Sequence, residues 1–80
     1  MRVRLLCFGR LTEARSEREA TIELADGVDD TAALRAWLAR DHPGFAQPSV
    51  RIALNGEVVT GDRPLVDGDE VAFMPPVSGG

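Results

Sequence analysis

One helical segment stands in this chain between stretches whose side chains alternate in polarity. Over residues 31–41 the apolar positions recur at helical spacing, at Leu34, Trp37 and Leu38. Asp29 or Asp30 is suited to cap the start of this helix, and Pro43 follows its end. A lone amphipathic helix must bury its apolar face against other elements, so the alternating stretches are expected to supply a sheet.

The alternating stretches predict five β-strands, at residues 3–8, 21–24, 50–54, 57–59 and 69–74. Asn55-Gly56, between the third and the fourth, is a strong signal for a two-residue hairpin. Residues 10–19 are polar and are expected to form a loop or a single helical turn. The order of strands and helix predicts an α+β domain in which the helix lies across one face of a mixed sheet.

Length and composition limit the class of protein. Eighty residues make one domain, residues 1–80, and a chain that is 44% hydrophobic and 28% charged is typical of a globular protein. Thirteen acidic against nine basic residues give a net charge of −4, so nucleic acid is not an expected partner. The single cysteine cannot form an internal disulfide, and the apolar run at 5–8 is too short for a signal peptide or a membrane span. The cytoplasm is therefore the expected location.

Few side chains are suited to catalysis. His42, the sole histidine, lies near the predicted end of the helix, where an imidazole commonly caps. Cys7 shares a strand face with Val3 and Leu5 and is expected to be a small buried hydrophobe. One histidine and one cysteine do not make a zinc site, so we expect no metal and no permanently bound cofactor.

The last six residues are expected to form an extended, flexible and functional tail: Pro75, Pro76, Val77, Ser78, Gly79 and Gly80. The prolines restrict φ and favour extended neighbours, and the glycines carry no Cβ, so such a tail fits a narrow channel. Four extended residues reach roughly 13 Å. The carboxylate of Gly80 is the functional group at the tip, and because a carboxylate is a poor acyl donor, another protein is expected to activate it.

No lysine occurs in the chain, and all nine basic residues are arginines. If the tail is ever joined to an amine, the acceptor must therefore lie on another molecule or at the N-terminus of another copy.

Apolar side chains are also expected on the sheet face that the helix does not cover. If Val3 and Leu5 face the helix, then Leu6, Phe8 and Met74 lie on the opposite face, near the root of the tail. Large exposed apolar groups at one place usually mark a partner site, which predicts a partner-binding role for Phe8, Met74 and a valine of the fourth strand, Val58 or Val59. Leu6 is equally compatible with a place in that partner site and with burial beneath the loop at residues 10–19.

The last thirteen residues, Gly-Asp-Glu-Val-Ala-Phe-Met-Pro-Pro-Val-Ser-Gly-Gly at 68–80, closely resemble the small, sulfur-carrier subunits of molybdopterin synthase. The opening strand, the helix around 33–35, the Asn55-Gly56 hairpin and the length extend the resemblance over the whole chain. It implies the fold of these carriers, the ubiquitin-like β-grasp, with one main helix packed on a mixed sheet and an extended C-terminal tail.

The resemblance also implies a reaction cycle with three partners. An ATP-dependent, E1-like activating enzyme would adenylate the Gly80 carboxylate, and a sulfurtransferase or cysteine desulfurase would supply the sulfur of a C-terminal thiocarboxylate. The large catalytic subunit of the synthase would then use this sulfur to convert cyclic pyranopterin monophosphate into the molybdopterin dithiolene. Two small and two large subunits would form a heterotetramer, in which the small subunit donates sulfur but is not catalytic alone.

The same resemblance assigns roles along the tail and on the patch. Gly80 would carry the adenylate and then the sulfur, Gly79 would give clearance, and residues 75–78 would line the way into the active site. Phe8, Val59 and Met74 would dock the partner. Met74 stands where some members of the family have a second aromatic residue.

Three other interpretations stay open. Sulfur carriers for thiamine thiazole synthesis also end in Gly-Gly, although they are usually shorter and lack the Pro-Pro-Val context. A ubiquitin-like protein modifier would form an isopeptide bond through Gly80, with the same activation chemistry. A plain binding module would leave the tail inert.

Overall fold

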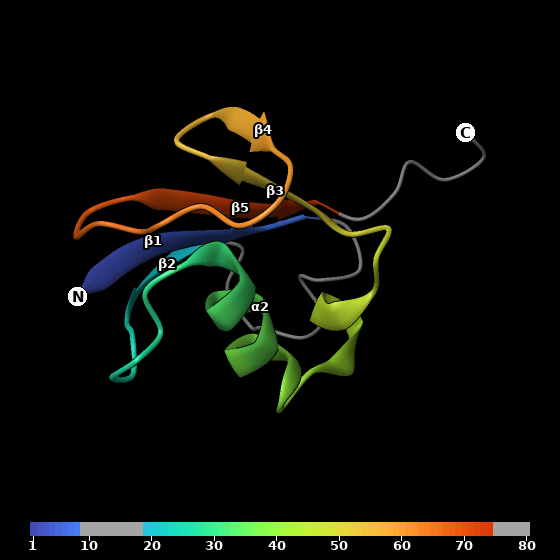
Figure 1. The fold of residues 1–80 in the computed structure, drawn as a ribbon, viewed down its shortest axis with the longest axis horizontal. Coiled ribbons are helices and arrows are strands. Elements are labelled where there is room, and N and C mark those ends of the chain that lie inside the picture. Colours follow the sequence, from blue (N-terminus) through green and yellow to red (C-terminus); the bar gives the residue numbers. More distant parts are fainter. Residues whose placement is uncertain (9–18, 75–80) are drawn as a thin grey trace.

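The computed structural model describes residues 1–8 and 19–74, and it has the predicted α+β order (Figure 1). Its elements are β1 (Arg2–Cys7), β2 (Glu19–Glu23), α2 (Thr31–Ala39), a 3-10 helix η1 (Pro43–Ala46), β3 (Arg51–Leu54), β4 (Glu57–Val59) and β5 (Glu70–Met74). Each predicted strand is present, with ends that agree with the prediction or differ from it by at most two residues. The predictions for residues 10–18 and for the tail at 75–80 lie outside the described residues.

The five strands form one mixed sheet in the order β2-β1-β5-β3-β4. β1 and β5 are parallel, and the other three pairs are antiparallel. α2 and η1 lie together against one face of this sheet, which confirms the predicted layers (Figure 1). The face that α2 covers is called the helix face below, and the opposite one is called the far face.

The helix starts where its capping residue stands. Asp30 is the N-cap, and its Oδ1 accepts a hydrogen bond of 2.7 Å from the backbone N–H of Ala33. Leu34 and Leu38 are buried, and Trp37 packs half-buried beside them, as the helical spacing predicted. α2 ends at Ala39, two residues before the predicted end, because the chain turns there into η1.

The core lies between the helix face and the two helices. Val3, Leu5 and Cys7 of β1 are buried there with Val71 and Phe73 of β5, as the alternation predicted. A residue that the sequence analysis did not single out joins them. Phe45 of η1 is 0% exposed and meets Phe73 edge to face, with 5.2 Å between the ring centroids. The short helix after Pro43 is therefore part of the core and not only the end of α2.

Arg35 fastens the η1 segment to α2. Its Nη1 donates to the backbone carbonyls of Gln47 at 3.0 Å and Phe45 at 3.4 Å, and its Nη2 donates to that of Val50 at 2.8 Å. A planar guanidinium has enough donors for three carbonyls, whereas an ammonium is a single point charge. This side chain therefore satisfies backbone groups of a segment that is otherwise irregular.

The predicted hairpin turn is confirmed at Asn55-Gly56. Both residues have positive φ, 52° and 85°, as a type I′ turn requires. The Asn55 side chain also accepts from the N–H of Glu70 at 2.9 Å and donates to the buried carboxylate of Asp69 at 2.9 Å. The other oxygen of Asp69 accepts from the N–H of Val66 at 2.8 Å. These bonds join the β3–β4 turn to the start of β5.

Replacing Arg35 tests this fastening. We expect Arg35→Ala to lower the free energy of unfolding by about 1–3 kcal/mol, because hydrogen bonds from a charged donor to partly buried carbonyls are lost. Arg40→Ala is the matched control, since the Arg40 side chain at the end of α2 is exposed and should change stability by less than about 0.5 kcal/mol. Urea unfolding followed by circular dichroism measures both. Equal stability of the two variants would contradict a role for Arg35 in holding η1.

Candidate functional site

The predicted tail leaves the described structure at Met74, so the surface around Met74 is where its root lies. The tail residues themselves, Pro75, Pro76, Val77, Ser78, Gly79 and Gly80, are outside the described residues, and their roles stay predictions. Met74 is half-buried at the end of β5 and pairs with Arg51 of β3. On its other side, the N–H of Phe8 bonds to the carbonyl of Phe73 at 3.2 Å.

Strand register decides which side chains share the far face with Met74. Leu6 pairs with Ala72, Ala72 pairs with Ala53, and Ala53 pairs with Val58, so one row crosses four strands. Phe8 continues the ladder of β1 one step beyond Leu6 and lies on the same face. We call these residues the apolar patch: Leu6, Phe8, Ala53, Val58, Ala72 and Met74.

The two large exposed members of the apolar patch are Phe8 and Val58, which are 42% and 52% exposed. Leu6 and Met74 are half-buried beside them. Large apolar side chains exposed on one face of a sheet are common on a surface that contacts another protein. The patch is at the end of the sheet from which the tail leaves, which is where the sequence analysis expected it.

The rest of the far face is charged. Arg4 of β1 forms ion pairs with Glu19 of β2 and, at 3.4 Å, with Glu70 of β5, while Arg2 lies 3.6 Å from Glu23. Exposed pairs of this kind each contribute at most about 1 kcal/mol to stability. They form a charged part of the far face over β2 and the start of β1, and Arg51 is a charged neighbour of Met74 at the apolar patch.

The register corrects one expectation for the patch. Val59 pairs with Ile52, so it lies on the helix face, where it packs half-buried against the core. Placing Val59 on the far face is therefore wrong, and Val58 takes that position. Residues 57 to 59 all have apolar or long side chains, so the local sequence does not show which of these residues point toward the helix. Leu6 stays open, because the 9–18 segment is outside the described residues.

Residues suited to side-chain chemistry are not brought together. Cys7 is 0% exposed in the core, and His42 lies beside η1 with its ring edge toward Phe45. Within residues 1–8 and 19–74, no group of three or more histidine, cysteine, aspartate or glutamate side chains is placed to hold a metal ion. The same residues include no helix long and apolar enough to cross a membrane. A hollow of about 490 Å³ between α2 and the 61–62 turn is open to solvent and includes Arg35, which already binds carbonyls.

Among the described residues, the sheet order and one main helix on a mixed sheet define a ubiquitin-like β-grasp protein. The model of the ThiS family matches residues 5–80. The chain therefore belongs to the ThiS family.

Curated relatives support the resemblance found in the sequence. The molybdopterin synthase sulfur carrier subunit of Chlamydomonas reinhardtii is 39% identical over 87 residues, an alignment that covers 100% of both chains. The protein of the same name from Escherichia coli is 37% identical over 82 residues and covers 98% of this chain and 99% of its own. The resemblance to molybdopterin synthase sulfur carriers is confirmed over nearly the whole length.

Solved structures agree with the fold. A chain of the complex of subunits 1 and 2 of the molybdopterin-converting factor of Helicobacter pylori matches with a TM-score of 0.63 and 29% identity, over 100% of each chain. The modifier protein SAMP1 of Haloferax volcanii matches with a TM-score of 0.77 and 24% identity, also over 100% of each chain. The second likeness shows the fold alone.

Paired valine substitutions test the register of β4. We expect Val59→Asp to lower the free energy of unfolding by about 2 kcal/mol or more, because it places a carboxylate against the core. Val58→Asp, its neighbour on the exposed side, should change stability by within about 0.5 kcal/mol. Thermal unfolding of both variants gives the comparison, and the reverse order of stabilities would mean that β4 presents its other face to the helix.

Proposed function

We propose that this chain is the sulfur-carrier subunit of a molybdopterin synthase and that Gly80 carries the sulfur as a C-terminal thiocarboxylate. The observation that carries the proposal is the apolar patch at the root of a segment that ends in Gly-Gly, in a chain whose curated relatives are named as such carriers. Side chains suited to catalysis are scattered in the described residues, which is compatible with a reactive group at the chain end.

The proposed cycle begins with activation by an ATP-dependent, E1-like enzyme. An oxygen of the Gly80 carboxylate attacks the α-phosphorus of ATP, pyrophosphate leaves, and the resulting acyl adenylate has AMP as a good leaving group. ATP is thus a substrate of the partner rather than a cofactor of this chain. Use of ATP, with a single cysteine in the chain, supports a cytoplasmic location.

Sulfur then replaces AMP. The terminal sulfur of a persulfide, held by a sulfurtransferase or produced by a cysteine desulfurase, attacks the acyl carbon and forms a C–S bond as the C–O bond to AMP breaks. The product is an acyl disulfide, and a further thiol cleaves its S–S bond to release the thiocarboxylate and form a new disulfide. In the large subunit, two thiocarboxylates would be used in turn to transfer two sulfurs to cyclic pyranopterin monophosphate and build the dithiolene, and water would return each Gly80 acyl group to a carboxylate.

The partner for the apolar patch is, in this proposal, the large catalytic subunit. The Helicobacter pylori structure is a complex of subunits 1 and 2 of the molybdopterin-converting factor, and its likeness to this chain supports a pairing of the same kind. A heterotetramer of two small and two large subunits would place one apolar patch against each large subunit. Docking next to Met74 would direct residues 75–80 into the active site.

A protein modifier conjugated through Gly80 is the second candidate, favoured by the fold shared with SAMP1. A sulfur carrier for thiazole synthesis is the third, since the ThiS family model matches the chain. The intact mass of the protein purified from cells separates them. A sulfur in place of one C-terminal oxygen supports a carrier, conjugates on other proteins support a modifier, and capture of a large synthase subunit distinguishes molybdopterin from thiazole synthesis.

Tail variants test the carrier role. We expect deletion of Gly80, or Gly79→Trp, to lower dithiolene formation by about 100-fold or more, because the reacting carbon is lost or misplaced. Both variants should keep the unfolding temperature of the parent chain, and Asp26→Asn, in an exposed turn, is the control with normal activity. Conversion of cyclic pyranopterin monophosphate in the reconstituted synthase is the measurement. Normal conversion by either tail variant would remove Gly80 from the mechanism.

Patch variants test the docking surface. We expect Phe8→Asp to weaken binding of the large subunit by about tenfold or more, because a charge would be desolvated in the contact. Val66→Asp is the matched control, since Val66 is 63% exposed but lies outside the apolar patch. Isothermal titration with the large subunit compares the two, with circular dichroism to confirm that both are folded. Equal binding by the variants would show that the patch is not the contact surface.

A further inference from the structure

An activated C-terminus can react with nucleophilic groups of the chain that carries it. Acyl adenylates and thioesters react with amines and with thiolates, so any accessible lysine or cysteine within reach of Gly80 would compete with the intended acceptor. This inference rests on the proposed function, because it concerns what the activated end can and cannot attack.

The chain contains no amine-bearing side chain. All nine basic residues are arginines, including the three in residues 9–18 outside the described structure, although lysine is among the commonest residues of globular chains. A guanidinium stays protonated at any physiological pH and does not act as a nucleophile, whereas a lysine ammonium releases a nucleophilic amine. The exclusive use of arginine therefore leaves the chain without a side-chain amine that an activated Gly80 could acylate.

The fold does not explain the choice of arginine at most of these sites. Of the six described arginines, Arg35 is the one that binds three carbonyls and depends on the shape of a guanidinium. Arg2 and Arg4 form exposed ion pairs, which a lysine can also make. Arg40, Arg51 and Arg63 have exposed side chains that form no ion pair or side-chain hydrogen bond with a described residue. Packing and hydrogen bonding therefore leave lysine permissible at several positions.

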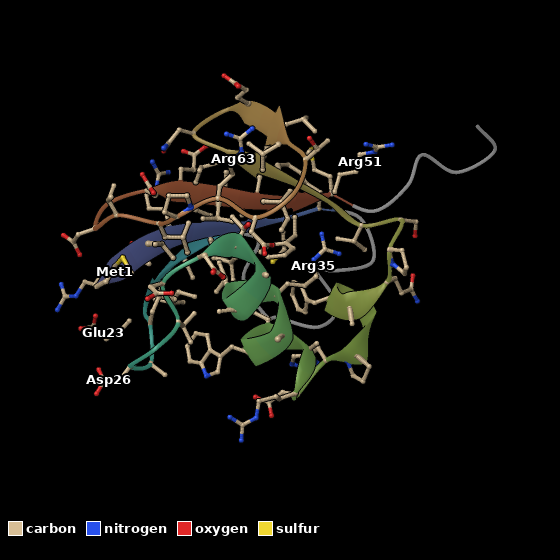
Figure 2. The ribbon with its side chains drawn as sticks, viewed as in Figure 1. Met1, Glu23, Asp26, Arg35, Arg51 and Arg63 are labelled. Atoms are coloured by element: carbon tan, nitrogen blue, oxygen red, sulfur yellow. The ribbon has the colours of Figure 1, made fainter. Side chains whose placement is uncertain are left out.

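The fold separates the thiol of Cys7 and the α-amino group of Met1 from the tail. Cys7, the single thiol, is 0% exposed beneath α2. The α-amino group of Met1 is paired with Glu23 at 3.1 Å, at the start of β1. Because β1 and β5 run parallel, Met1 and Met74 lie at opposite ends of the sheet, and Figure 2 shows Met1 and Glu23 far from Arg51. Six residues beyond Met74 span at most about 20 Å, and the seven residue steps from Met1 to Phe8 span about 23 Å.

We propose that the absence of lysine and the burial of the one thiol protect this domain from acylation by its own activated end, so that, apart from water, the acceptors that discharge Gly80 belong to other molecules. The excluded reaction is acyl transfer to the chain itself. An amine nitrogen would attack the Gly80 carbonyl carbon, a C–N bond would form, the bond to AMP or to a thiol would break, and the amine would lose one proton. The amide product would be a dead end for a sulfur carrier.

Introducing one lysine at a chosen distance from the root of the tail tests this proposal. The full chain is made as a Gly80 thioester by intein cleavage, so the activated end does not depend on any activating enzyme. Arg51→Lys places an amine opposite Met74 at the root of the tail, within reach of six residues. Arg2→Lys is the matched control, because Arg2 lies six residue steps before Phe8, about 20 Å along the strand, a distance that only a fully extended tail could span.

We expect the parent thioester to decay by hydrolysis alone at about pH 9, where lysine amines begin to deprotonate. The Arg51→Lys thioester should form an internal amide, lighter by the lost thiol, at least about tenfold faster than Arg2→Lys, because the local concentration of the tail is higher. Cys7→Ala should leave the parent lifetime unchanged. Intact-mass spectrometry over time and peptide mapping of the product measure all four chains.

Three results would overturn the proposal. The Arg51→Lys thioester could persist as long as the parent, the parent could acylate itself at the rate of that variant, or Cys7→Ala could lengthen the lifetime severalfold. Equal rates for Arg2→Lys and Arg51→Lys would contradict the part that depends on reach. A chain that never acquires sulfur in cells would instead contradict the sulfur-carrier role, so the two failures are distinguishable.

Discussion

The parallel pairing of β1 with β5 is the interaction on which the rest of this structure depends. It joins the first strand to the last, with backbone bonds from Arg4 to Asp69 at 2.8 Å and from Phe8 to Phe73 at 3.2 Å. Parallel strands cannot be joined by a tight turn, so β2, α2 and the β3–β4 hairpin all lie in the connection between them. The same pairing puts Cys7 beside Phe73 in the core and Phe8 beside the end of β5 on the surface.

This register gives the two faces of the sheet different roles. The helix face carries most of the apolar core residues, and α2 and Phe45 of η1 cover it. The far face is charged over β2 and apolar near Met74, so one sheet supplies both a core and a contact surface. A slip of one residue in any strand would exchange these roles, since alternate side chains point to opposite faces. Positioning of the tail therefore depends on the same hydrogen bonds that stabilise the domain.

Much of this arrangement was predictable from local pattern. The cap at Asp30, the hairpin at Asn55 and the alternation in β1 and β5 are properties of a few neighbouring residues, and each is confirmed. The roles of Phe45 and Arg35 were not predictable, because both depend on how the chain after Pro43 folds back on α2. The face of Val59 was assigned wrongly for a similar reason: a three-residue strand has too short a pattern to show which side meets the core.

By itself the sequence determined the order of elements, the Gly-Gly end and a chemistry without lysine, since these are properties of residue identity and short-range spacing. Only the tertiary structure decided which apolar side chains became the core and which became the patch, because that choice depends on register between strands far apart in the chain. It also decided that Met1 lies at the end of the sheet away from Met74. Long-range pairing, and not composition, sets those distances.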